Sequence, residues 1–293
     1  MRIEMKKKLV ALFAVGMLLF GAVGSADAVF VTEWNYTLFT EFNGTNTFTS
    51  GTGTKIQTDN QVSWGASGSA NAVFGTAERS GITIAQTAGA NQALTNVTGT
   101  YFTNSFANPG QGHWITHHNK PISASYATLL TSQIESTLTL VPVNPPIGGQ
   151  FGPATITFTV NFKETPNAGP CVAGTGNTPC GDIFALQQDA FNVPFSFAGE
   201  TYYVSIFPTQ AIGITLPLTG GLPILSSAAC QAAGIPSGVC VGFVTPEDQR
   251  TSVRFGFVIT GQPINIVPEP STFVLIGAGL LGLGFAARRR MKK

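Results

Sequence analysis

The sequence predicts an all-β protein with a single antiparallel β-sandwich or jelly-roll-like domain. Two observations predict this fold. Apolar side chains alternate with polar ones through most of residues 29–266, and no helical period is evident there. The 34 glycines and 18 prolines are scattered between the apolar runs, where they are typical of turns and not of a disordered tract.

The expected strands follow one another along the chain. Alternation is clearest in Phe30–Phe42, whose apolar face carries Trp34, in Ala154–Lys163 and in Val253–Ile259. We interpret the proline-rich segment 141–149 as a long loop within one domain. Further strands are expected at Ile56–Trp64, Ala70–Thr76, Gly112–His118, Ser123–Leu140, Thr201–Phe207 and Val241–Val244.

The distribution of charge excludes one class of function. The formal net charge of +1 conceals an acidic middle, because the basic residues gather at the two ends of the chain. Residues 29–267 therefore lack the basic surface that nucleic-acid binding requires. We expect no nucleic acid among the partners.

Residues 1–28 have the pattern of a secretory signal peptide. A basic start at 6–8 precedes an apolar stretch at 9–23, and Ala26 and Ala28 form a small-x-small cleavage pattern for signal peptidase. An uncleaved membrane anchor is the alternative, but the apolar stretch is short for a span of ~20 residues. The domain at 29–266 is then exported across the inner membrane.

The C-terminal residues 267–293 combine three parts in order. A Pro-Glu-Pro motif comes first, an apolar and glycine-rich segment at 271–287 follows, and a basic cluster closes the chain. Physical reasoning alone indicates a short transmembrane helix with a cytoplasmic basic tail. The residues of the motif are Pro268, Glu269 and Pro270, and those of the basic cluster are Arg288, Arg289 and Arg290.

This order of parts resembles the PEP-CTERM protein-sorting signal, from Val267 to about Arg290. The resemblance implies a Gram-negative bacterium that makes exopolysaccharide. It also implies that an exosortase, a transpeptidase-like membrane enzyme, recognises the Pro-Glu-Pro motif and processes a membrane-anchored precursor. The mature protein would then lie at the cell surface or outside the cell. A plain C-terminal anchor is the alternative.

All three histidines lie in one expected strand. Four steps along a strand would separate His113 from His117 by ~13 Å, whereas ligands of one zinc ion must each lie ~2 Å from it. His118 would point to the opposite face. We therefore expect a structural role, and a metal-dependent hydrolase centred on these histidines is an alternative.

The end of this strand carries a second resemblance. Thr116, His117, His118 and Asn119 resemble the signature of the THxN family of PEP-CTERM proteins, and the sorting signal follows them in the same chain. The resemblance implies no established activity and therefore no role for these four residues.

The four cysteines indicate disulfides, because their number is even and the compartment is expected to be oxidising. Four cysteines allow three pairings, and we favour the two local ones, each closing a short loop that we expect to be exposed. A four-thiolate zinc site is less favoured, since its ligands usually come in closer pairs. The favoured pairs are Cys171 with Cys180 and Cys230 with Cys240.

A few side chains are candidates for contact with sugars. The indoles of Trp64 and Trp114 suit pyranose stacking as well as core packing. Glycosidase chemistry needs two carboxylates at fixed separations, which spacing in the sequence does not determine. The candidate carboxylate pairs are Glu33 with Glu41 and Asp182 with Asp189.

We therefore expect a non-enzymatic structural protein of the cell surface or biofilm matrix, with no catalytic residue, cofactor or metal. The expected partners are an exosortase, signal peptidase and, transiently, the inner membrane. The alternative is a carbohydrate-binding module for exopolysaccharide that uses Trp64, Trp114 and His113.

Overall fold

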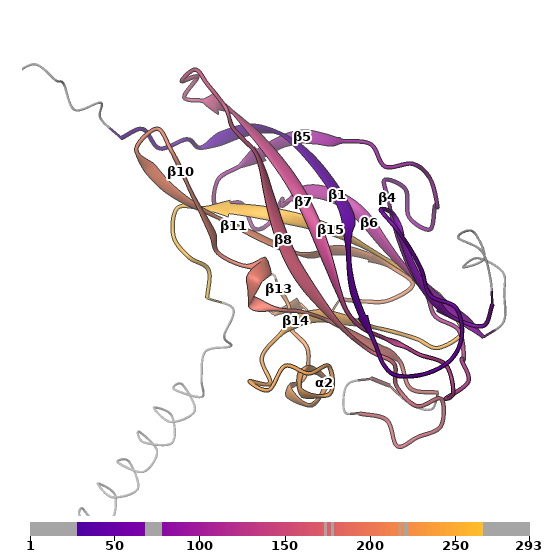
Figure 1. Ribbon diagram of the computed structural model, residues 1–293. Helices are drawn as coiled ribbons and strands as arrows, with labels where there is room; N and C mark the ends of the chain where they lie inside the picture. The colour runs from indigo at the N-terminus through magenta and orange to yellow at the C-terminus, as the bar shows by residue number, and fades with distance from the viewer. Residues whose placement is uncertain are drawn as a thin grey trace, which may run out of the picture.

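The computed structural model describes residues 28–67, 78–172, 175–176, 179–216, 218–219 and 222–265. They form two curled antiparallel sheets, which confirms the all-β prediction (Figure 1). The six-stranded sheet has the order β14-β9-β8-β7-β1-β5, and the seven-stranded sheet has the order β10-β11-β15-β6-β4-β3-β2. The expected transmembrane helix and signal peptide lie outside the described residues.

The strands of the six-stranded sheet are β1 (Glu33–Phe48), β5 (Val97–Phe102), β7 (Leu129–Asn144), β8 (Phe151–Lys163), β9 (Asp182–Leu186) and β14 (Val241–Thr245). Those of the seven-stranded sheet are β2 (Ile56–Thr58), β3 (Gln61–Gly65), β4 (Arg79–Ala85), β6 (Gly110–His118), β10 (Val193–Phe197), β11 (Glu200–Ile212) and β15 (Arg250–Thr260). A small hairpin consists of β12 (Leu218–Thr219) and β13 (Leu222–Pro223).

The hydrophobic core lies between the two sheets. Tyr36 of β1 packs edge-on against Phe257 of β15, with ring centroids 4.9 Å apart. Phe158 of β8 stacks on Phe255 of β15 at 6.2 Å. All four side chains are buried, and burying each contributes ~1.5–3 kcal/mol. The apolar faces of the two sheets therefore hold the sandwich together.

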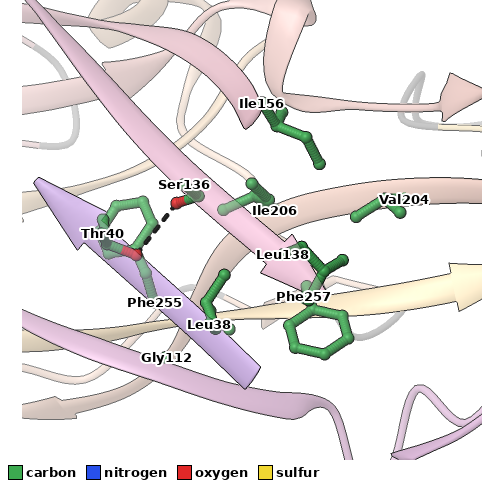
Figure 2. Close-up of a pocket in the computed structure, with 11 residues that line it drawn as sticks. Leu38, Thr40, Gly112, Ser136, Leu138, Ile156, Val204, Ile206, Phe255 and Phe257 are labelled. Carbon is green, nitrogen blue, oxygen red and sulfur yellow. Dashed lines mark hydrogen bonds between the residues drawn. The ribbon is translucent and has the colours of Figure 1, made fainter. Parts of the chain in front are cut away.

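This core leaves little empty space. Leu38, Leu138, Ile206 and Phe257 line a cavity of about 10 Å³, and a hydrogen bond of 3.0 Å joins Thr40 Oγ1 to Ser136 Oγ at its edge (Figure 2). Such a volume is at the lower limit for one water molecule. The cavity is a packing gap and offers no room for a sugar or a cofactor.

The outer faces join neighbouring strands through hydroxyl and amide groups. Thr137 Oγ1 of β7 lies 3.2 Å from Thr155 Oγ1 of β8, and Thr100 Oγ1 of β5 donates to Asn35 Oδ1 of β1 at 2.9 Å. Both pairs are exposed, and the two residues of each pair lie directly opposite each other on neighbouring strands. Cross-strand pairs of this kind contribute ~0.2–1 kcal/mol each.

Most of the predicted strands are present, with corrections at their ends. The predicted apolar face of β1 holds from Trp34 to Phe42 but not at Phe30, which is 37% exposed, because the ladder with β7 changes register between Glu33 and Trp34. The predicted strand at 123–140 begins only at Leu129 and continues to Asn144, so the loop predicted at 141–149 starts later.

Two further predictions about strands need comment. The single strand predicted at Ile56–Trp64 is wrong, because a turn at 59–60 divides it into β2 and β3, which pair as a hairpin. The strand predicted at Ala70–Thr76 lies outside the described residues.

The alternation of apolar and polar residues does not predict six of the described strands, β12 and β13 among them, or the two described helical turns. Every residue of β4 and of β9 is buried, so neither sequence alternates. The short strands β5 and β10 were also not predicted. Helix α2 (Ser227–Ala232) begins after Ser226, whose side chain accepts a hydrogen bond from Ala229 N, and a 3₁₀ turn covers Gln188–Ala190.

The structure contains both local disulfides, Cys171–Cys180 and Cys230–Cys240. The loop between Cys230 and Cys240 is exposed in part, as expected, but both of its cysteines are buried, at 0% and 3% exposure. They belong to a small satellite core with Ile183 of β9 and Ala229 of α2. The buried bridge therefore attaches α2 to the edge of the six-stranded sheet beside β14 (Figure 1).

Candidate functional site

The histidine-rich strand β6 occupies the interior of the seven-stranded sheet, between β15 and β4. Its ladder with β15 changes register in the stretch that contains His113. His113 Nε2 lies 2.9 Å from Thr95 O, whereas the ring of His117 packs in the core against Phe162 at 5.3 Å. The structure therefore does not bring the histidines together as the hydrolase alternative required.

Each histidine is held in its neutral form by its surroundings. His117 Nδ1 lies 2.8 Å from Thr245 Oγ1, and complete burial, with a smaller effect of the charge of His118, keeps the pKa of His117 well below its usual value. Burial, followed by the charges of Arg250 and Lys120, lowers the pKa of His118 to about 4. Neutral, buried rings are typical of structural histidines.

The pKa of His113 gives a testable pH dependence. Burial lowers this pKa, the bond to Thr95 opposes the shift, and Arg254 adds to it. The folded pKa therefore lies below the unfolded one, so this stabilising contribution is present above about pH 6.5 and is lost as the pH falls through the folded pKa. A protonated ring would also place an N–H on buried Nδ1, which has no hydrogen-bond partner.

We expect His113→Gln to lose less unfolding free energy than the wild type between pH 7 and pH 5, as measured by urea denaturation at each pH. Taking the difference between the two proteins removes the contribution of the other titrating groups. If the unfolding free energies of the two proteins changed in parallel with pH, the lowered pKa of His113 would be contradicted.

The Thr-His-His-Asn segment, residues 116–119, connects three parts of the fold. Thr116 Oγ1 lies 2.8 Å from Ser252 Oγ of β15 and accepts from Gly89 N at 3.0 Å. Asn119 Nδ2 donates to Thr245 O at 3.4 Å and to Pro246 O at 3.3 Å. Asn119 is fully buried, and its Oδ1 has no hydrogen-bond partner. The segment thus fixes the connection between β14 and β15 against β6.

Three carboxyl groups converge beside this segment, and we name Glu164, Asp182 and Glu247 the acidic cluster. Glu164 follows β8, Asp182 begins β9, and Glu247 lies in the turn between β14 and β15. One ligand oxygen of each lies within 4.8 Å of the others. Asp182 is 0% and Glu247 6% exposed, and Glu164 is partly buried.

The acidic cluster has few hydrogen-bond donors. Thr165 N donates to Asp182 Oδ1 at 2.8 Å, and Thr165 Oγ1 lies 3.4 Å from the same oxygen. Five carboxylate oxygens have no partner with the distance and angle of a hydrogen bond. They are Oδ2 of Asp182 and both oxygens of Glu164 and of Glu247. Asp182 was a sequence candidate, but with Asp189 as its expected partner. The cluster itself could not be predicted, because its members are far apart in the chain and carry no motif.

Burial is the main cause that raises the pKa of every group in the acidic cluster. The pKa of Glu164 is well above its usual value because of burial and then the charges of Asp182 and Glu247, while the nearby Trp64 indole opposes the shift. Burial also raises the pKa of Asp182 and of Glu247, and Asn119 opposes the shift in both. The positive charge and hydrogen-bond donors around these three carboxyl groups therefore do not offset the effect of burial on their pKa.

The candidate sugar-binding side chains are mostly inaccessible. Trp34 and Trp64 are 0% exposed and His113 is 1% exposed, which removes Trp64 and His113 from a surface ligand site. Trp114 is half-buried, and Arg254 Cζ lies 5.8 Å from the centroid of its ring. One of the two expected stacking platforms therefore remains.

The candidate glycosidase pairs are also separated. Glu33 and Glu41 lie eight residues apart on the same strand, which is roughly 26 Å. Asp182 begins β9, whereas Asp189 lies in the 3₁₀ turn after the other end of that strand. Two carboxyls that act on one glycosidic bond lie within about 9.5 Å. Asp189 Oδ2 instead accepts from Thr159 N at 3.0 Å.

The sorting residues and Ala26 of the predicted cleavage site lie outside the described residues. Among the residues that the structure does describe, no helix has the length and apolar character needed to cross a membrane.

One comparison with known proteins gives a match. Residues 267–290 match the family model of the PEP-CTERM protein-sorting motif, which confirms the motif predicted from Pro268, Glu269 and Pro270. The motif implies an exported protein whose membrane-anchored precursor is processed by an exosortase. No curated protein and no solved structure matches the chain.

Proposed function

We propose that this exosortase-sorted protein is a non-catalytic structural component of the cell surface or extracellular matrix. The sorting motif at 267–290 carries the proposal, because it implies export and exosortase processing of the precursor. The outer faces of the long strands support it, since their hydroxyl and amide groups join the strands of the domain to one another. The buried neutral histidines also favour a structural role over a catalytic one.

The sorting step is tested by replacing Pro268, Glu269 and Pro270 together with alanine in the producing bacterium. We expect the precursor to accumulate in the membrane fraction and the surface-accessible mature form to be lost, as followed by immunoblotting after protease treatment of whole cells. Replacing Arg288, Arg289 and Arg290 with lysine is the matched control, because it keeps the basic charge. Normal maturation of the triple-alanine protein would contradict a role of the motif.

The structural role is tested against the carbohydrate-binding alternative with the mature protein and the exopolysaccharide of its own bacterium. We expect no saturable binding and no change in tryptophan fluorescence. Saturable binding that Trp114→Ala abolishes would instead favour a carbohydrate-binding module, because Trp114 is the one candidate platform left outside the core.

A further inference from the structure

We propose that the acidic cluster, together with Asn119, binds one calcium ion. Glu164, Asp182 and Glu247 supply carboxylate oxygens from three segments, and Asn119 lies against two of these carboxyls from the end of β6. A bound ion there would connect the ends of β8 and β9 in one sheet to the strands β6 and β15 of the other.

The negative charge of the acidic cluster is not balanced by nearby positive charge. Up to three negative charges converge in a largely buried space, and a buried carboxylate is costly unless a cation or hydrogen-bond donors compensate it. Lys163 and Lys120 are the basic side chains that act on the cluster, and theirs are the smallest effects there. Lys163 is exposed, and Lys120 Nζ already pairs with Asp248 Oδ1 at 2.6 Å.

Asn119 supplies an independent observation. Its side chain is 0% exposed, and its amide acts on the carboxyl groups of Asp182 and Glu247 as a hydrogen-bond donor that lowers their pKa. Its amide nitrogen donates to two main-chain carbonyls, whereas Oδ1 accepts no hydrogen bond. Buried amide oxygens normally have a donor or a cation as partner, so this orphaned oxygen indicates a missing ligand.

The chemistry of the donors selects the kind of ion. All the available ligand atoms are oxygens, which suit hard cations, while the four cysteines are in disulfides and His117 Nδ1 is engaged by Thr245. Calcium–oxygen distances of about 2.3–2.6 Å place opposite ligands up to roughly 5 Å apart. The 4.8 Å limit on the spread of the cluster matches that size.

Calcium fits this site better than magnesium. Calcium accepts six to eight ligands in irregular geometry, with carboxylates bound through one or both oxygens, whereas magnesium demands a near-ideal octahedron and retains several waters. Three carboxylates and one amide provide up to seven oxygens in an irregular set.

The first experiment uses the mature full-length domain, stripped with a chelator and titrated with calcium chloride at pH 7. We expect the melting temperature to rise by about 5–10 °C once calcium exceeds its dissociation constant by 100-fold. Asp182→Asn should abolish this rise, and Asn119→Ala should weaken calcium binding by about tenfold. Asp59→Asn is the matched control, because Asp59 is exposed, acts on Glu41 and is not a member of the cluster.

Terbium luminescence gives a second readout that does not depend on stability. Trp64 lies beside Glu164, so excitation of its indole should sensitise a terbium ion bound in the cluster, and calcium should displace that ion. Trp64→Phe should lose the sensitised emission and keep the calcium-dependent rise in melting temperature.

Two results would overturn the proposal. One is the absence of both a thermal shift and sensitised terbium emission in the wild type. The other is binding that Asp182→Asn retains, which would show adventitious binding of ions at the surface. Both readouts are made in vitro on purified protein, so neither depends on the sorting pathway.

Discussion

Trp64→Ala is expected to lower the free energy of unfolding by about 3–5 kcal/mol. The side chain is fully buried, stacks on His117 with centroids 6.0 Å apart and lies 5.0 Å from the ring of Phe162. Truncation would remove its contacts with both rings and leave a cavity between the sheets. Urea denaturation followed by circular dichroism measures the loss.

Trp114→Ala is the matched control for this truncation. It removes the same indole from a half-buried position on β6, where Arg254 lies over the ring. We expect a loss of less than about 1 kcal/mol, since surface substitutions away from special features rarely cost more. Equal losses of unfolding free energy for the two variants would contradict the conclusion that Trp64 is buried more deeply than Trp114.

Replacing both Cys230 and Cys240 with alanine is expected to destabilise the fold by about 3 kcal/mol through chain entropy alone. An additional loss is expected because this bridge is buried and attaches α2 to the satellite core with Ile183. Calorimetric unfolding of the oxidised protein and the variant measures the difference.

The Cys171 and Cys180 pair provides the comparison. The two bridges span similar separations, 9 and 10 residues, so their entropic contributions are nearly equal. Replacing this pair with alanine should cost less than replacing Cys230 and Cys240, and hydrogen exchange in α2 should stay slow. The reverse order would show that the contacts of the second bridge in the satellite core add nothing to stability.

The fold could be predicted where a strand has one buried and one exposed face. The alternation in β1 and β8 records that asymmetry directly in the sequence. The same rule fails for β4 and β9, because both faces of these strands are buried and even polar residues such as Arg79 and Asp182 lie inside the fold. The register shift near Glu33 was also not visible, since it depends on the pairing with β7.

The candidate site could be predicted only in part. The segment ending at Asn119 was singled out for its three histidines, yet it is the asparagine that contacts the acidic cluster. Glu164, Asp182 and Glu247 are single acidic residues in unremarkable surroundings, and only the packing of the two sheets brings them together. Local spacing carries no signal for a cluster of that kind.

The hydroxyl pairs on the outer strand faces also determine how the domain responds to its medium. An exported protein meets whatever salinity the environment supplies, and dissolved ions screen attraction between exposed charges within about 10 Å at 0.1 M salt. Contacts such as Thr137–Thr155 and Asn35–Thr100 are between neutral groups, which such screening leaves unchanged. The strands of this domain can therefore remain paired in fresh water and in brine alike.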